Sequence, residues 1–565
     1  MLRRSVWILL SLCACAVTEG PDDDGGDDSA VDENPQLPVE ESAVLLSDTD
    51  RLLRIAMTLK GTRPSIAEFE AVEADASALD GIVDDYLESV EFGATVRDIE
   101  NEAHLVRTEF VANRTLDGAP ELGEVALADI RTEEPLKLVE YVVMNDRPYT
   151  EILTMSGTVG TQYQPLIGAG IGDAFDPNGP EWQPLPHIDG RGVAGILTTD
   201  GWHARWASNP ANAQRLRASH ATDALICADY LTGDVQLASV DLTSEEAVNN
   251  AILFEPACVS CHQTMDPIAN AMFGFAGRPE SNRDYPTVMF DPREADDGPG
   301  ITGRPIGYYG RGGDNLSEIA ILMAEDTRLS SCAAQRYLSY ITQTPRSEVP
   351  FEQVISAQRA LTESDMSIKA MVKHIVLSDA FATSHVTDAE VAERVAGILR
   401  TRPRQLDRMF RDLTGFTWLG TNGRSGEAFV VPTSASRGFQ VHGGGIEVFN
   451  KQTATHLNSA SSVAFLRAFA AEAAADVVVN DFDQPAAQRR LLSQVELDTT
   501  DPALLRAQFV DLHLRIYGER VEADSQDVSD TLALFSDLDS LNSNRTQVWT
   551  LVLTAMLQDI RVATY

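Results

Sequence analysis

Apolar residues recur at helical spacing along most of the chain, and this pattern predicts a mainly α fold. An early helix is expected to begin at Asp48-Thr49-Asp50 and to end at Gly61-Thr62-Arg63-Pro64. Ser65-Ile66-Ala67-Glu68 has the S-x-x-E form of a capping box, so a second helix should start there. A third helix is expected from Leu79 to Phe92.

Helical spacing continues through the rest of the chain, with interruptions that are rich in glycine and proline. Residues 122–153 should be helical, with Pro135 at a helix start, and residues 192–230 should be helical as well. Loops are predicted at residues 155–190, 277–314 and 420–445.

Changes in composition divide the 565 residues into six segments, more than one of which is long enough to bury a core. The predicted segments are a lipoprotein signal peptide (1–15), an acidic disordered linker (16–43), an N-terminal helical module (44–160), a connecting module of loops and helices (161–244), a module that carries a C-x-x-C-H motif (245–386) and a C-terminal helical module (387–565).

The N-terminus has the features of an export signal. Arg3 and Arg4 precede the apolar run Ser5 to Leu12, which is shorter than the roughly 20 residues that span a bilayer. Leu12-Cys13-Ala14-Cys15 resembles a bacterial lipobox, which implies cleavage before Cys15 and a lipid on its thiol. Signal cleavage without lipidation is the alternative. We therefore expect a periplasmic or cell-surface protein that is lipid-anchored to a bacterial membrane.

The chain is strongly acidic, with 85 Asp and Glu against 44 Lys and Arg and a formal net charge of −41. Nucleic-acid phosphates are bound by Lys and Arg, so a nucleic-acid partner is not expected. The same charge opposes adsorption to anionic lipids, so membrane contact is expected only through the anchor. An acidic surface favours solubility and could attract a basic redox partner, whose identity the sequence does not indicate.

Cys258-Val259-Ser260-Cys261-His262 is a C-x-x-C-H motif, which is typical of covalent c-type haem attachment. Two cysteines three positions apart lie on one side of a helical turn, where their thiols can add to the two haem vinyl groups. The histidine that follows them can reach the iron. We therefore predict one haem c, with thioethers to Cys258 and Cys261 and with His262 as proximal ligand.

Three other interpretations of the motif remain open. A zinc site would need a second ligand pair, and a thioredoxin-like motif would need a βαβ setting. A Cys258–Cys261 disulfide is the third alternative, and it would leave a haem-free surface scaffold.

Methionine is a frequent sixth ligand in electron-transfer cytochromes. Met289 lies in a proline-containing loop, far enough from His262 to reach the other face of the haem, and is our predicted ligand. Met265 is too close to His262 to reach the opposite face of the haem. An open sixth position is possible, and the weaker candidates are Met272, Met323, His187, His203 and His220.

Cys227 and Cys332 flank the motif in sequence. In an oxidising compartment two remaining cysteines tend to pair, so we predict a disulfide between them, with two buried free thiols as the alternative.

The residues around the motif resemble a known family. Cys258 to Ile268 is similar to the C-x-x-C-H-x-x-x-D-P-[LI]-G-F signature of the planctomycete-type cytochrome c domain family, whose multidomain members also occur in myxobacteria. Further similar fragments are Arg51 to Phe92, Asn145 to Glu151, Gly195 to Thr198, Cys227 and Cys332 with Arg336-Tyr337-Leu338. The resemblance implies haem binding and electron transfer, and no particular reaction.

This chain departs from the family pattern after the motif. Ala269 to Phe275 stands where the family usually has an acidic pair, which puts the redox potential or the substrate in doubt. Asp266-Pro267 is expected to cap the next helix.

Three functions follow from these residues. The first is an electron-transfer cytochrome, the second a haem-containing oxidoreductase with an unknown substrate, and the third the haem-free scaffold. No nucleophilic triad, P-loop, dinucleotide fingerprint or H-E-x-x-H motif is present, so we assign no catalytic residue.

Overall fold

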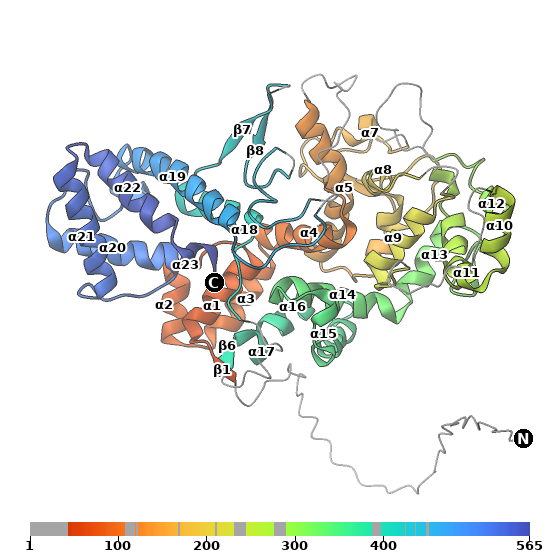
Figure 1. Cartoon of the computed structure of the whole chain (residues 1–565), viewed down its shortest axis with the longest axis horizontal. Coiled ribbons are helices and arrows are strands. Elements are labelled where there is room, and N and C mark those ends of the chain that lie inside the picture. The colour runs from red at the N-terminus through yellow and green to blue at the C-terminus, as the bar shows by residue number, and fades with distance from the viewer. Residues whose placement is uncertain are drawn as a thin grey trace, which may run out of the picture. The chain divides into compact units, whose positions relative to one another are not determined.

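The computed structural model is mainly α-helical and multidomain, as the sequence predicts (Figure 1). The predicted signal peptide, Cys15, the acidic linker up to residue 42 and Met289 lie outside the residues that it describes, so they remain predictions. The described residues are 43–107, 119, 122–167, 170–208, 212–230, 244–275, 290–386, 397–423, 425–435, 437–447 and 451–565.

The first two helices begin at local capping signals. Helix α1 (Asp48–Leu59) starts after Ser47, whose hydroxyl accepts a hydrogen bond from the backbone N–H of Asp50. Helix α2 (Ile66–Ala74) opens with the predicted capping box, in which Ser65 and Glu68 each accept a backbone N–H of the other. These contacts satisfy N–H groups that have no partner inside a helix.

The predicted third helix is two helices. Helix α3 (Ala78–Leu87) ends before Ser89, and helix α4 (Val90–His104) begins after it. The Ser89 hydroxyl accepts a hydrogen bond from the backbone N–H of Phe92 at 3.2 Å and so caps a new helix.

The prediction that Pro135 starts a helix is wrong, because Pro135 lies inside helix α5 (Glu124–Met144). Proline has no N–H to bond to the carbonyl four residues earlier, which is that of Arg131. Helix α8 (Asp200–Arg205) packs against this point through Gly201. A Cβ atom at Gly201 would lie 2.0 Å from the Arg131 carbonyl oxygen, so only glycine allows this close approach.

Beside this contact lies a buried acid, Glu134. Its carboxylate accepts hydrogen bonds from the Thr158 hydroxyl and the Gly201 backbone N–H, both at 2.8 Å. Burial, together with the nearby charge of Asp200, raises the pKa of Glu134 to about 7.

The remaining elements up to Cys227 are short. The predicted loop at 155–190 contains only small elements, and the helix expected over 192–230 is divided into η1, α8 and α9. These elements are α6 (Glu151–Thr154), β2 (Thr158–Gly160), α7 (Gln164–Ile167), β3 (Gln183–Leu185), the 3-10 helix η1 (Gly195–Thr198) and α9 (Arg215–Ile226).

The segment after Cys227 alternates helices with loops. It contains α10 (Glu245–Phe254), α11 (Pro256–Asn270), η2 (Phe273–Phe275), α12 (Gly298–Thr302), β4 (Gly307–Tyr308), β5 (Arg311–Gly312), α13 (Leu316–Ala324), α14 (Thr327–Thr342), η3 (Arg346–Glu348), α15 (Phe351–Glu363), α16 (Ile368–Val376), α17 (Asp379–Ala382) and β6 (Thr383–Val386).

The C-terminal module is helical apart from a hairpin and loop. Its elements are α18 (Pro403–Thr414), β7 (Leu419–Thr421), β8 (Ala428–Val430), α19 (Ala460–Phe482), η5 (Ala486–Gln488), α20 (Pro502–Tyr517), α21 (Gln526–Leu541), α22 (Arg545–Leu557) and α23 (Ile560–Ala563). The strands form antiparallel pairs, β1 (Ala43–Leu45) with β6, β2 with β3, β4 with β5 and β7 with β8.

Two hydrophobic cores hold these elements together. The first draws side chains from all three modules predicted over 44–160, 161–244 and 245–386, so these modules share one interior. The second is formed mainly by α18 to α23, with α19 packed along α22. Helix α1 contributes Ile55 to the first core and Met57 to the second, and so joins them.

The structure contains the predicted disulfide. Cys227 caps the C-terminus of α9, and Cys332 lies in α14, 105 residues later. Helix α11 and the C-x-x-C-H motif lie within the segment that this bond closes. Helices α9 and α14 pack against each other, so the bond joins elements that are already in contact.

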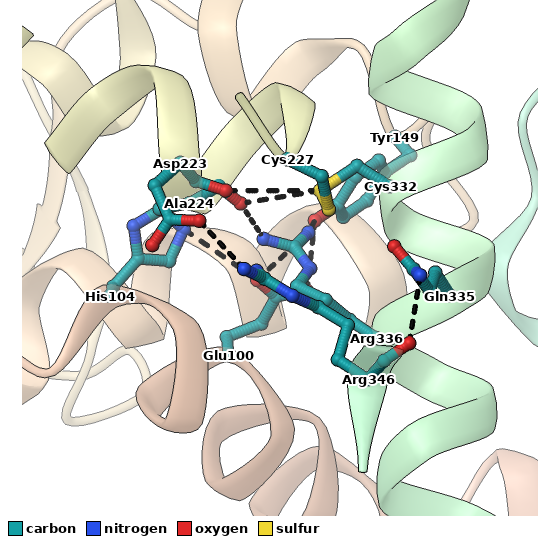
Figure 2. Close-up of a disulfide and its surroundings, with 10 residues drawn as sticks. All are labelled: Glu100, His104, Tyr149, Asp223, Ala224, Cys227, Cys332, Gln335, Arg336 and Arg346. Carbon is teal, nitrogen blue, oxygen red and sulfur yellow. Dashed lines mark hydrogen bonds and ion pairs between the residues drawn. A yellow bond between two sulfur atoms is a disulfide. The ribbon is translucent and has the colours of Figure 1, made fainter. Parts of the chain in front are cut away.

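Figure 2 shows a buried ionic cluster next to the disulfide. Glu100 of α4 is fully buried, and its carboxylate lies 3.5 Å from the Arg336 guanidinium of α14. The Tyr149 hydroxyl donates to Glu100 at 2.9 Å and accepts from Arg336, which also donates to the carbonyl of Ala224 in α9. One arginine thus connects four separate parts of the first core.

Replacing both Cys227 and Cys332 by alanine should lower the free energy of unfolding by about 4 kcal/mol, because a closed loop of this length restricts the unfolded chain. Urea denaturation measures the change. The control is the Cys258→Ala/Cys261→Ala variant, made in a host without c-type haem maturation, since it also removes two cysteines but no crosslink. Equal losses in the two variants would contradict the prediction.

Raising the pH from 5 to 8 should destabilise the fold through Glu134. In the unfolded chain this group loses its proton near its ordinary pKa of 4.5, whereas the folded group keeps it until about 7. Its stabilising contribution is therefore complete below pH 4.5 and is lost as the pH rises to 7. Urea midpoints across this range should fall less steeply in Glu134→Gln, whereas Glu70→Gln, at an exposed site on α2, should follow the unmodified chain.

Candidate functional site

The C-x-x-C-H motif lies on the first turns of α11. Pro256 occupies the first turn of the helix, a position that needs no N–H partner. Cys258, Cys261 and His262 are three and four positions apart, so they share one face of the helix. Each is partly exposed, and both cysteines are free thiols rather than partners in a disulfide.

The prediction that Asp266-Pro267 caps a new helix is wrong, because α11 continues through both residues to Asn270. The Asp266 side chain is fully buried instead. It lies one turn beyond His262, and its Oδ1 atom is 2.9 Å from the His262 Nδ1 atom. The sequence spacing H-x-x-x-D, read along a helix, could have indicated this contact.

Two arginines from other parts of the fold surround Asp266. Arg215 of α9 donates to both carboxylate oxygens, at 2.7 and 3.2 Å, and the Arg304 side chain lies 3.9 Å away. Burial alone would raise the pKa of Asp266, but the hydrogen bonds from His262 and Arg215 outweigh burial and lower this pKa. The carboxylate is therefore ionised at neutral pH.

This ionised carboxylate decides how His262 is oriented. A carboxylate can only accept hydrogen bonds, so the proton of the neutral His262 imidazole lies on Nδ1. The lone pair on Nε2 is then available for a metal. Metal-binding histidines commonly donate their second ring N–H to a carboxylate in this way. Cys258, Cys261 and His262 thus fit the demands of covalent haem attachment.

A patch of aromatic hydroxyls lies beside Cys261. The Cys261 Sγ atom is 3.9 Å from the carbonyl oxygen of Tyr230, whose hydroxyl donates to Thr264 at 3.1 Å. The hydroxyls of Tyr230 and Tyr309 are 3.4 Å apart. Burial raises the pKa of Tyr230, so this hydroxyl stays protonated at physiological pH.

The other methionines and histidines considered as sixth ligand lie within the described residues. Met265, Met272 and Met323 are buried in the first hydrophobic core. The Nε2 atoms of His203 and His220 lie 2.8 and 3.0 Å from backbone carbonyl oxygens. Met289 lies outside the described residues, so it stays a prediction.

His187 is the remaining histidine candidate. Both of its ring nitrogens are buried without a hydrogen-bond partner among the described residues. Burial lowers the pKa of His187 to about 3, so its imidazole is neutral. No described contact joins it to α11.

In the part of the chain that the structure describes, no group of three or more His, Cys, Asp or Glu side chains could hold a metal ion.

No family model, curated protein or solved structure matches this chain. The family resemblance of the motif therefore remains an expectation from the residues themselves.

Replacing Asp266 with asparagine should lower the free energy of unfolding by about 3 kcal/mol. The largely buried guanidinium of Arg215 would then lose the carboxylate with which it pairs. Thermal or urea unfolding of the haem-free protein measures the loss. Glu246→Gln on the neighbouring helix α10 makes the same change of charge at an exposed site and should cost little. Similar losses in both variants would contradict a specific role for Asp266.

Proposed function

We propose that this protein is an exported c-type cytochrome that carries one covalent haem and transfers electrons. Cys258 and Cys261 would form the thioethers, and His262 would be the proximal ligand. The observation that carries the proposal is the arrangement on α11, where both free thiols and the histidine share a face and a buried carboxylate holds the His262 Nδ1 atom.

When bound, haem c supplies an iron atom that gains and loses one electron. The residues of this chain set the surroundings of that iron. The hydrogen bond from His262 to the ionised Asp266 makes the imidazole a stronger electron donor, which favours the oxidised state. Arg215 opposes this effect in part, because it withdraws charge from the same carboxylate.

The cellular setting is part of the proposal. Covalent haem attachment takes place outside the bacterial cytoplasmic membrane, which agrees with the N-terminal export signal and with the Cys227–Cys332 disulfide. A lipid on Cys15 would hold the protein at the membrane. None of the helices within the described residues is long and apolar enough to span a bilayer. The net charge of −41 would suit a basic redox partner.

Expression in a host with c-type haem maturation tests the proposal. The purified protein should retain its colour through acid–acetone extraction and give the pyridine haemochrome spectrum of haem c. The Cys258→Ala/Cys261→Ala variant should lose the colour, whereas Cys227→Ala/Cys332→Ala should keep the attached haem wherever it folds. A colourless protein from a host that matures a control cytochrome would overturn the proposal and favour the scaffold.

Asp266→Asn should keep the covalent haem and raise its reduction potential, because the imidazole loses its anionic partner. Redox titration followed by visible absorbance measures the shift, with Glu246→Gln as the control of equal charge change. An unchanged potential in Asp266→Asn would contradict the role given to this carboxylate.

A further inference from the structure

A cavity of about 270 Å³ lies between α4, α5, the start of α18 and the loop that follows β8. None of its lining residues belongs to α11, so it is separate from the proposed haem site. Both apolar and polar side chains form its wall, and the charged residues there are Arg107, Asp129, Glu133, Arg404 and Arg437. The charges that remain without a partner decide what this cavity can bind.

Most charged groups of the wall already have partners. Arg107 donates to Asp98 at 2.6 Å, and two further nitrogens of its guanidinium donate to the two carboxylate oxygens of Glu133. Asp129 and Arg437 each have an interaction partner as well. These four wall residues therefore serve the fold.

Arg404 is the exception among the charged residues of the wall. Within the described part of the chain its guanidinium makes no hydrogen bond, and its ion pair with Asp98 is long, at 3.7 Å. Its side chain is 29% exposed, and none of its nitrogen atoms is closed off from water. Arg404 thus presents unpartnered donors to the water-filled space that it lines.

The charge of Arg404 is incompletely neutralised because Asp98 is shared. The Asp98 carboxylate also accepts hydrogen bonds from Arg107 and from Arg408, at 2.6 and 2.9 Å. Burial alone would raise the pKa of Asp98, but the three arginines outweigh burial and hold this pKa well below its usual range. Burial, together with the nearby charge of Arg107, lowers the pKa of Arg404, which stays charged at neutral pH.

Asn101 of α4 supplies a second donor. The residue is 3% exposed, and its Oδ1 atom accepts the backbone N–H of Arg107 at 2.9 Å. Because an N–H group needs an oxygen acceptor, this bond fixes the orientation of the amide and leaves Nδ2 on its other side. Among the described residues Nδ2 has no hydrogen-bond partner, and it is not closed off from water. Asn101 and Arg404 both line this cavity and the smaller one beside it.

We propose that this cavity binds a small monocarboxylic acid, whose carboxylate accepts hydrogen bonds from the Arg404 guanidinium and the Asn101 amide. A guanidinium matches the planar geometry of a carboxylate. Arg404 also lies in the first turn of α18, where the helix dipole favours a negative charge.

The rest of the wall restricts the ligand further. A single incompletely neutralised cation, with the Glu133 carboxylate in the same wall, disfavours a doubly charged oxyanion. The volume exceeds that of a bare carboxylate, and Val125, Phe429 and Ile446 would contact an apolar part of the acid.

Isothermal titration calorimetry of the full chain in a chloride buffer of low ionic strength tests this proposal. The probes are benzoate and acetate, with sulfate as a doubly charged anion and benzyl alcohol as an uncharged relative of benzoate. Benzoate should bind saturably and more tightly than the other three probes. Its binding should weaken as the salt concentration rises.

Three variants locate the site. Arg404→Gln should weaken benzoate binding by about 10- to 100-fold, because a hydrogen bond to a charged group is lost. Asn101→Asp keeps the acceptor for the Arg107 N–H but replaces the donor with a carboxylate oxygen, so binding should fall by at least about 10-fold. Arg467→Gln makes the same change of charge at an exposed position of α19 outside the cavity and should bind as the unmodified chain does.

The test does not depend on the Asn101 variant, which changes a buried residue. In Arg404→Gln, Asp98 keeps its hydrogen bonds to Arg107 and Arg408, so this variant should fold, and thermal unfolding checks that it does.

Three results would overturn the proposal. The first is no saturable binding of benzoate at low salt. The second is binding of benzyl alcohol or sulfate as tight as that of benzoate, because the site would then not select a single carboxylate. The third is an equal loss of affinity in Arg467→Gln and Arg404→Gln, because that would reflect net charge alone.

Discussion

The arrangement of the first core depends on the buried negative charge of Glu100. A carboxylate without solvent is tolerated only where a cation and hydrogen-bond donors meet it, and Arg336 and Tyr149 supply them. Because Arg336 also donates to the carbonyl of Ala224, the end of α9 is tied to α4 and α14 at one point. The disulfide closes the same junction (Figure 2). Helix α11, which carries the C-x-x-C-H motif, packs on α9 and therefore on one of the helices that this cluster ties together.

Sequence reasoning succeeded where the signal was local. The capping box at Ser65 lies within four residues, and the structure has it as predicted. It failed at Pro135, because proline is common at the first turn of a helix, whereas here α5 continues through it and Gly201 of α8 packs against the carbonyl that has lost its N–H partner. Gly201 lies far along the chain, so no residue near Pro135 predicts this contact. The break at Ser89 was local and could have been found, since a serine before an apolar run is a common cap.

At the candidate site, too, local sequence predicted some features, whereas others depend on contacts between distant segments. The spacing of Cys258, Cys261 and His262 could be interpreted from the motif, and the pairing of Cys227 with Cys332 followed from the cysteines that remained. Asp266 was misassigned because an Asp-Pro pair favours a helix start in isolation. Its actual role comes from Arg215 on α9, a contact that only the folded chain brings about. The predicted sixth ligand, Met289, lies outside the described residues and stays a prediction.

The four cysteines from Cys227 to Cys332 create a sorting problem during maturation. Four thiols can pair in three ways, and an oxidising compartment does not itself choose among them. The fold separates the two kinds: Cys227 and Cys332 meet on packed helices, with Cys332 only 2% exposed, whereas Cys258 and Cys261 stay partly accessible on α11. Under the proposed export, a reductant outside the cytoplasm can reach the second pair and leave the first intact. Docking of α9 on α14 at an early stage of folding would keep the thiols that the proposed haem requires from being consumed in the wrong crosslink.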